Sequence, residues 1–251
     1  MRRTFTVADL AAAAHGIDAT VLVQTLTVPE ETPELLALAA QHELIAGVVG
    51  WVDLTAADVA DALAALTAGG RLVGIRHQVQ SEPDPQWLCR ADVRRGLREV
   101  ARAGLAYDLL TIPVQLPAAI ETVRALSDLQ FVVDHLSKPP IAGGALEPWA
   151  TQMRALAEHD NVVCKLSGMV TEADWDAWSV ADLRPYAETV LNAFGADRVM
   201  FGSDWPVCLL AASYDAVLAA AEELTAQLSD AERAEIFGGT AHRSYTLGGR
   251  A

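Results

Sequence analysis

The most restrictive feature of this 251-residue chain is a regular alternation of short apolar runs and amphipathic segments. Seven runs have the length and apolar character of strands, and segments with helical periodicity lie between them. Repeated strand–helix alternation predicts an α/β fold with a parallel sheet, either open or closed into a barrel. The predicted strands are Thr20–Thr25, Ile45–Leu54, Leu72–Gln78, Tyr107–Pro113, Gln130–His135, Asn161–Ser167 and Arg198–Ser203.

Seven strands are one fewer than an eight-stranded (β/α) barrel needs. Because the chain begins with a predicted helix, opened by a capping-box pattern at Thr6 and Asp9, the absent strand is expected to be the first. An open barrel would expose two strand edges, which a homodimer could pair or bury. The other predicted helical segments are Ala56–Leu66, Asp92–Ala103, Pro117–Leu126, Trp149–His159, Asp182–Ala193, Tyr214–Leu228 and Asp230–Phe237.

Composition narrows the class of protein. The formal net charge is −15 and no dense Lys/Arg cluster occurs, which argues against a nucleic-acid partner. The apolar runs are too short to span a membrane, and the N-terminus lacks the apolar block of a signal peptide, so we expect a cytoplasmic protein. Three widely spaced cysteines predict reduced thiols. Without linkers or low-complexity segments, residues 1–251 are predicted to form one domain.

The glycine pattern argues against a dinucleotide-binding fold. Such a fold carries a glycine-rich phosphate fingerprint after its first strand, and none follows the first predicted strand here. The pair Gly238-Gly239 comes after a predicted helix near the C-terminus, where we interpret it as a helix stop.

An acidic residue follows the last predicted strand. Val199–Phe201 is an apolar run of the kind buried on both faces of a sheet, and it gives way to Gly202-Ser-Asp-Trp-Pro206. Asp204 therefore lies at the carboxyl end of a parallel strand, where α/β enzymes place their catalytic groups. Trp205 beside it is a candidate wall of the pocket. The structural alternative is that Asp204 only caps a turn before the proline.

A histidine ends the fifth predicted strand. Side-chain alternation places Phe131, Val133 and His135 on one face and Asp134 on the other. If Phe131 and Val133 fill the barrel, His135 enters its mouth, where a histidine can polarise a carbonyl, transfer a proton or bind a metal. The alternative is a histidine with a purely structural role.

Three cationic or titratable groups lie on other predicted strands. Lys165 shares a face with Ser167 inside a strongly apolar strand, so it needs a partner such as Asp204 or an anionic substrate. Arg76 and His77 end the third predicted strand, where a guanidinium can bind a carboxylate through two hydrogen bonds. The alternatives are a lysine that reaches solvent between the outer helices, an exposed arginine and a histidine bonded to backbone.

Several of these stretches together resemble one known family. Val133-Asp-His-Leu-Ser-Lys-Pro-Pro140, Cys164-Lys-Leu-Ser-Gly168 and Phe201-Gly-Ser-Asp-Trp-Pro206 are similar, in this order, to motifs of the amidohydrolase-related lactonases. That group includes sugar-lactone hydrolases and 2-pyrone-4,6-dicarboxylate hydrolases. The resemblance extends over almost the whole chain and implies a (β/α)₈ barrel. Gly74-Ile-Arg-His77 and Val21-Leu-Val-Gln24 fit the same pattern.

The chain departs from the family pattern at one point. Family members carry a His-x-His pair on the first barrel strand, and no His-x-His occurs in this sequence. Either the sequence is shortened or it is a natural variant that lacks part of the site. The resemblance also implies a divalent metal such as zinc in many relatives. His135 and Asp204 alone would supply fewer than the three protein ligands common at catalytic zinc, so a site without metal or other cofactor is expected.

Carried over to this chain, the resemblance implies a hydrolase of carbohydrate metabolism that opens a small-molecule lactone, either a sugar-acid lactone or a pyrone dicarboxylate. Asp204 would activate water and His135 would polarise the scissile carbonyl. Arg76, His77, Lys165 and Trp205 would contact the substrate. Two alternatives stay open: a metal-dependent decarboxylase of the same superfamily, and a non-catalytic homologue that lacks the first strand.

Overall fold

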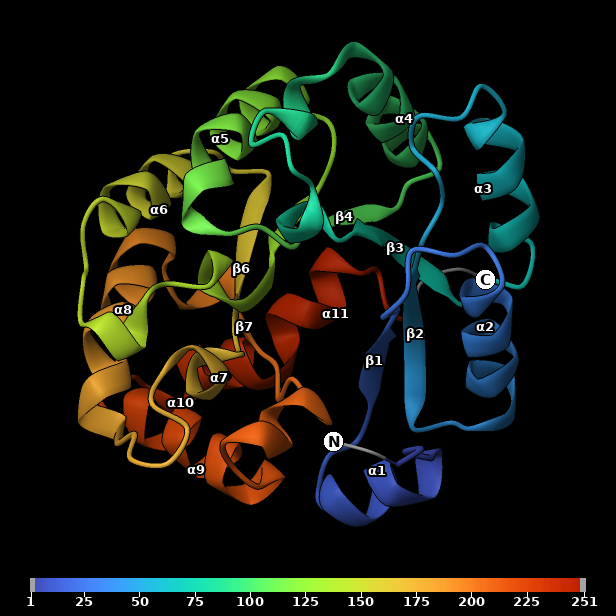
Figure 1. Ribbon diagram of the computed structural model, residues 1–251. Coiled ribbons are helices and arrows are strands. Elements are labelled where there is room, and N and C mark those ends of the chain that lie inside the picture. The colour runs from blue at the N-terminus through green and yellow to red at the C-terminus, as the bar shows by residue number, and fades with distance from the viewer. Residues whose placement is uncertain (1–2, 249–251) are drawn as a thin grey trace.

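Seven parallel strands form a single curved sheet in the computed structural model, which describes residues 3–248. Each strand pairs with the next one in the chain, so the order is β1 to β7, and β1 and β7 are the two edges. The fold is thus a TIM-type α/β barrel that lacks one strand, as the alternation predicts (Figure 1). The strands are β1 Thr20–Val23, β2 Ile45–Gly50, β3 Leu72–His77, β4 Ala106–Leu109, β5 Phe131–Val133, β6 Val162–Leu166 and β7 Val199–Phe201.

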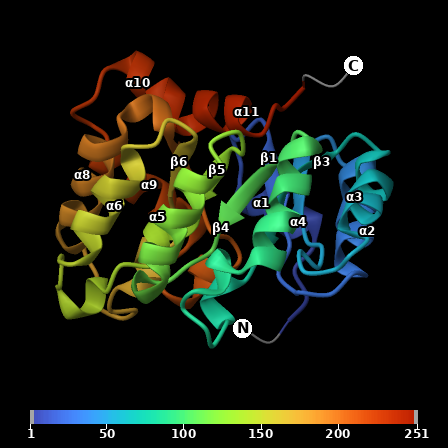
Figure 2. The same ribbon diagram turned by 90° about the horizontal axis from the view of Figure 1, so that it is seen from above.

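Helices cover the convex side of this sheet, as expected for parallel strands buried on both faces (Figures 1 and 2). Large apolar side chains of the strands and helices pack there into one extended core. Within residues 3–248, no helix is long and apolar enough to cross a membrane. The helices are α1 Val7–Ala13, α2 Glu31–Gln41, α3 Val59–Thr67, α4 Ala91–Arg102, α5 Leu116–Ala125, α6 Trp149–Ala157, α7 Met169–Glu172, α8 Val180–Phe194, α9 Tyr214–Leu224, α10 Asp230–Ala234 and α11 Thr240–Ser244.

The concave side of the sheet has its own small apolar core. Strand residues pack there against Tyr245, which follows α11, and Leu247 packs on the same cluster. Figure 2 shows α10 and α11 at the end of the sheet away from the arrowhead of β4, which is the amino end of the strands. The C-terminal segment therefore closes this end of the barrel, and the opposite, carboxyl end is left for a site. The strand residues of this core are Val49, Val73, Ala106, Val132, Val163 and Met200.

Two local predictions are wrong. Phe131 and Val133 pack into the outer core with the helices, and Val132 faces the barrel interior, so the predicted assignment of faces on β5 is reversed. Gly238-Gly239 does not stop a helix. It lies in a π-helical turn, Glu235–Gly239, which continues directly into α11 and contacts β7.

Candidate active site

Strand β5 ends in an unusual turn that positions His135. The strand stops at Val133, and the four residues from His135 to Lys138 have backbone φ angles between 50° and 54°. This left-handed region is uncommon for residues other than glycine, and strain of this kind concentrates at functional sites. Because the chain leaves the strand here, His135 reaches the mouth of the barrel even though Asp134 is the residue that faces the interior.

Three side-chain contacts hold this left-handed turn. The indole Nε1 of Trp149 donates a hydrogen bond to the carbonyl of Leu136 at 2.7 Å. The hydroxyls of Ser137 and Thr111 are 2.8 Å apart and fully buried. The Lys138 amine forms an ion pair of 2.7 Å with Glu172 at the end of α7. Since a strained backbone persists only where its surroundings impose it, these contacts account for the shape of the turn.

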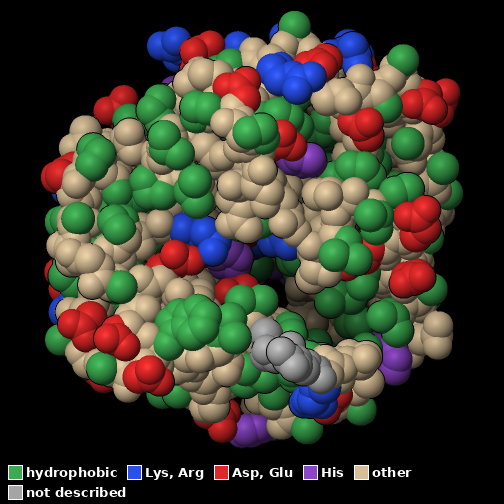
Figure 3. Space-filling view, viewed as in Figure 1, with side chains coloured by type: hydrophobic (Ala, Val, Ile, Leu, Met, Phe, Trp, Pro, Cys, Tyr) green, Lys and Arg blue, Asp and Glu red, His purple; other side chains and the backbone are tan. Residues whose placement is uncertain are grey.

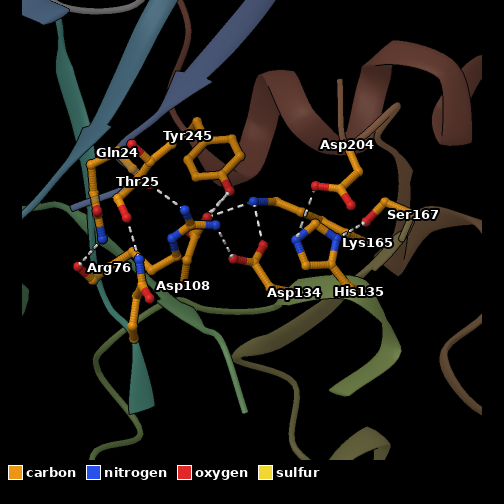
Figure 4. Close-up of polar contacts among 11 residues, drawn as sticks. Gln24, Thr25, Arg76, Asp108, Asp134, His135, Lys165, Ser167, Asp204 and Tyr245 are labelled. Carbon is orange, nitrogen blue, oxygen red and sulfur yellow. Dashed lines mark hydrogen bonds and ion pairs between the residues drawn. The ribbon is translucent and has the colours of Figure 1, made fainter. Parts of the chain in front are cut away.

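His135, Asp204 and Ser167 meet where β5, β7 and β6 end (Figure 4). His135 Nε2 lies 3.6 Å from Asp204 Oδ1, and His135 Nδ1 lies 2.8 Å from the Ser167 hydroxyl. Asp204 has a φ of 54°, so it too sits in the left-handed region. The side chains of His135 and Asp204 are 13% and 15% exposed, so a small molecule can reach both. An imidazole and a carboxylate facing each other in this way can act as a hydrogen-bond donor and a general base.

Below this pair lies a network of buried charges. The Lys165 amine lies between two fully buried carboxylates, 2.5 Å from Asp108 and 2.6 Å from Asp134. Asp134 also forms an ion pair of 2.9 Å with Arg76, and the Tyr245 hydroxyl donates to both oxygens of Asp108 at 2.9 and 2.8 Å. We call these five residues the charge network. Figure 3 shows basic, acidic and histidine side chains gathered in a hollow at the centre of this face.

Burial and the neighbouring charges shift the pKa values of the residues in the charge network. Burial alone lowers the pKa of Lys165, but the charges of Asp108 and Asp134 outweigh it and raise that pKa well above its usual range. Burial alone raises the pKa of Asp134, but Lys165 and Arg76 outweigh it and hold that pKa below its usual range. Burial raises the pKa of Asp108, and the charge of Lys165 opposes this shift. Lys165 and Arg76 are therefore cations whose charge is already compensated by the protein.

The structure brings some predicted site residues together and separates others. Arg76 and Lys165 both point into the barrel and join the charge network, at 8% exposure each. The partners of Lys165 are Asp108 and Asp134, so the suggested pairing with Asp204 is wrong. Trp205 lies beside Asp204 at the mouth, where its ring contacts Phe5 at 5.2 Å between centroids.

His77 lies outside this group. It follows Arg76 on β3, so its side chain points to the other face of the sheet. Its Nε2 is 2.7 Å from Glu82, its Nδ1 accepts a hydrogen bond from Trp51 Nε1, and its ring stacks on Trp87. These contacts already occupy both ring nitrogens and one ring face. A substrate contact of His77 remains a prediction from the sequence.

Three members of the charge network are not among the residues predicted from sequence. Asp108 lies on β4, and Asp134 directly follows β5, the strand next to that of Lys165, so correct inward faces for these two stretches would have indicated both. Tyr245 gives no such signal, because it follows a short helix and reaches Asp108 across 137 residues of sequence.

Comparison with known proteins identifies the family of the chain. A family model described as amidohydrolase matches residues 1–247. The chain belongs to the amidohydrolase family. It is 43% identical over 246 residues to an L-fucono-1,5-lactonase of Burkholderia multivorans, a match that covers 93% of this chain and 82% of the relative.

Solved structures of amidohydrolases share the fold. A crystal structure of an amidohydrolase from Burkholderia multivorans with bound zinc has a TM-score of 0.90 and 42% identity, over 96% of this chain and 87% of that one. A structure from Acinetobacter baumannii, described as a "probable 2-pyrone-4,6-dicarboxylic acid hydrolase", has a TM-score of 0.80 and covers 98% of this chain and 92% of that one. At 18% identity, the second similarity is evidence for the fold alone.

The Burkholderia structure holds a zinc ion, which would need a matching set of donor side chains in this chain. Across residues 3–248, no group of three His, Cys, Asp or Glu side chains is placed to hold a metal ion. His135 and Asp204 would supply two ligands, one fewer than catalytic zinc sites commonly have. Asp108 and Asp134 are engaged by Lys165. The described donor set therefore does not fit a catalytic zinc.

Proposed function

We propose that this amidohydrolase hydrolyses a lactone, with Asp204 as the general base and His135 as the hydrogen-bond donor to the carbonyl. The observation that carries the proposal is the pair itself, in which His135 Nε2 and Asp204 Oδ1 face each other at 3.6 Å at the mouth of the barrel. The L-fucono-1,5-lactonase relative at 43% identity supports lactone hydrolysis as the reaction. The family resemblance of the sequence implies the same roles for both residues.

In the proposed reaction, the Asp204 carboxylate takes a proton from water as the water oxygen attacks the carbonyl carbon of the lactone. The carbonyl π electrons move to the oxygen, and the resulting oxyanion accepts a hydrogen bond from His135 Nε2–H. Collapse of this intermediate breaks the ring C–O bond. Protonated Asp204 returns its proton to the departing alkoxide, and the product is an open-chain hydroxy acid. No step needs a metal or another cofactor.

The charge network favours a neutral lactone over a dicarboxylate. Arg76 and Lys165 are both held by short ion pairs with Asp108 and Asp134, so neither cation is free to pair with a carboxylate of the substrate. The Asp204 carboxylate adds a negative charge at the mouth of the barrel. Since like charges repel across a partly buried site, a pyrone dicarboxylate would be disfavoured. We infer that the substrate is a sugar-acid lactone, because its carboxyl group forms the neutral ring ester.

The test is proton release during lactone hydrolysis, followed with a pH indicator on sugar-acid lactones and one pyrone dicarboxylate. Asp204→Asn keeps the shape of the side chain but loses the base, so kcat should fall by roughly 10² to 10⁴ with an unchanged melting temperature. Asp215→Asn is the matched control, because that carboxylate is 71% exposed on α9 and should leave turnover unaltered. Equal turnover of wild type and Asp204→Asn would refute the role of Asp204.

The same assay also bears on the two alternative functions inferred from the sequence, a decarboxylase and a non-catalytic homologue. A wild-type protein silent towards every lactone would favour a non-catalytic homologue. The metal-dependent decarboxylase gains no support from the described donor set, which provides two candidate ligands near the mouth. A cytoplasmic location, a role in carbohydrate metabolism, the lack of a nucleic-acid partner and a homodimer stay predictions.

A further inference from the structure

The imidazole of His135 rests against a surface formed by Ser167 and Gly168. Gly168 has a φ of +64°, and a Cβ atom built at this position would lie 2.7–2.8 Å from Cβ, Cγ and Nδ1 of His135. Real Cβ atoms do not approach other atoms so closely, so the ring packs directly on the glycine backbone. This contact fixes the plane of the ring, with Nδ1 directed towards Ser167 and Nε2 towards Asp204.

One nitrogen of the ring faces Ser167. The Ser167 side chain is 3% exposed, and its hydroxyl lies 2.8 Å from His135 Nδ1. Within the described part of the chain, Nδ1 is the partner found for this hydroxyl. A buried hydroxyl that only accepted a hydrogen bond would leave its own proton unpaired, which costs about 1–3 kcal/mol. This cost favours the arrangement in which the Ser167 hydroxyl donates to an Nδ1 that carries no proton.

The other nitrogen faces Asp204. Nε2 lies 3.6 Å from Asp204 Oδ1, and an ionised carboxylate only accepts hydrogen bonds. A proton on Nε2 suits this neighbour, because an Nε2 without a proton would place two hydrogen-bond acceptors opposite each other. Ser167 and Asp204 thus favour the same form of the neutral ring, with the proton on Nε2.

We propose that Ser167 is a positioning residue that holds His135 in the tautomer with its proton on Nε2. This inference rests on the proposed function, because the tautomer matters through the role of His135 as donor to the developing oxyanion. The donor N–H and the Asp204 carboxylate then face the same point, one for the carbonyl oxygen and one for the water. With the proton on Nδ1 instead, Nε2 would repel the oxyanion.

The tautomer is measured directly by ¹⁵N NMR of the whole protein labelled in its histidines. Comparison with the His135→Gln variant assigns the two ring nitrogens of His135 among the six histidines. In the wild type we expect a protonated Nε2 and an unprotonated Nδ1 in the neutral form. A wild-type ring that carries its proton mainly on Nδ1 would overturn the proposal, and this measurement needs neither a variant of Ser167 nor turnover.

The Ser167→Ala variant tests the cause. We expect a mixture of tautomers and a fall in kcat of roughly 10- to 100-fold with little change in KM, the usual size for loss of a supporting hydrogen bond. Ser167→Thr, which restores a hydroxyl, should recover most of both effects. Thr225→Val is the matched control, because it removes a fully buried hydroxyl with a 2.8 Å hydrogen bond at the end of α9.

The outcomes separate this inference from the proposed function. If Ser167→Ala keeps the wild-type tautomer and kcat, the positioning role is refuted. If the NMR result is as expected but the wild type turns over no lactone, the positioning of His135 stands and the proposed reaction fails. If Thr225→Val lowers kcat as much as Ser167→Ala, the effect reports stability and the positioning role is again refuted.

Discussion

At the scale of single residues, the candidate site depends on a position that has no side chain. Gly168 follows Ser167 after β6, and its backbone forms the surface on which the His135 ring lies. Both the positive φ of +64° and the closeness of the ring require glycine there. Gly168 therefore allows both the backbone turn after β6 and the placement of His135, a proposed catalytic group.

Replacement of Gly168 by alanine tests this dependence. We expect Gly168→Ala to lower the free energy of unfolding by about 1–3 kcal/mol from backbone strain, and to lower kcat because the new methyl group displaces the His135 ring. Chemical denaturation and lactone turnover measure the two effects. The control is Gly143→Ala, because a Cβ at that exposed position would meet no atom within 4 Å. Equal effects of the two substitutions would contradict the argument.

At the scale of elements, the C-terminal segment does more than close the amino end of the barrel. Tyr245 follows α11, packs in the concave core and donates its hydroxyl to Asp108. Burial raises the pKa of Tyr245 well above its usual range, so the hydroxyl keeps its proton and stays a donor. The segment thereby supports the carboxylate that holds the Lys165 amine.

Tyr245→Phe removes this hydroxyl and keeps the ring. Since a hydrogen bond to a charged group contributes about 1.5–3 kcal/mol, we expect a loss of that size in the free energy of unfolding. Tyr186→Phe is the control, because that buried tyrosine donates to a neutral carbonyl, Ala145, at 3.3 Å and should lose less. Urea denaturation measures both variants. A smaller effect at Tyr245 than at Tyr186 would show that Asp108 does not depend on the C-terminal segment.

At the scale of the whole molecule, buried charge makes stability depend on pH. The pKa of Asp134 is lower in the folded chain than its usual value of 3.8, because Lys165 and Arg76 outweigh the effect of burial. Ionised Asp134 therefore stabilises the folded state above the unfolded pKa, and this contribution is lost as the pH falls through the folded value. The ion pairs of Asp134 therefore help to hold the barrel together at neutral pH and weaken in acid.

Asp134→Asn measures this contribution. Loss of the carboxylate leaves Lys165 and Arg76 without a shared partner, so we expect the free energy of unfolding at pH 7 to fall by about 3–5 kcal/mol. The difference from wild type should shrink as the pH falls below about 4, where the unfolded carboxylate becomes protonated. Urea denaturation at several pH values gives the result, with exposed Asp215→Asn as the control. A difference that is independent of pH would contradict this account.

Much of this architecture can be predicted from the sequence. Seven strands separated by helices follow from local periodicity, because a strand or helix imprints its own repeat on neighbouring residues. The placement of Asp204 at the end of β7, and the need of Lys165 for buried partners, follow from burial costs along single strands. The alternation of side chains nevertheless predicted the wrong faces for β5. This strand has only three residues, which is too short a run to distinguish the inner face from the outer.

The sequence itself thus determined the pattern of elements, the acidic strand end and the need for a partner of a lysine inside an apolar strand, because each depends on residues close together in the chain. Only the tertiary structure decided which carboxylates hold Lys165, how Tyr245 reaches Asp108, and how a left-handed turn brings His135 to Asp204 and Ser167. These contacts join residues that are distant in the chain. They exist because the sheet curves and its strand ends converge, and no local periodicity encodes that geometry.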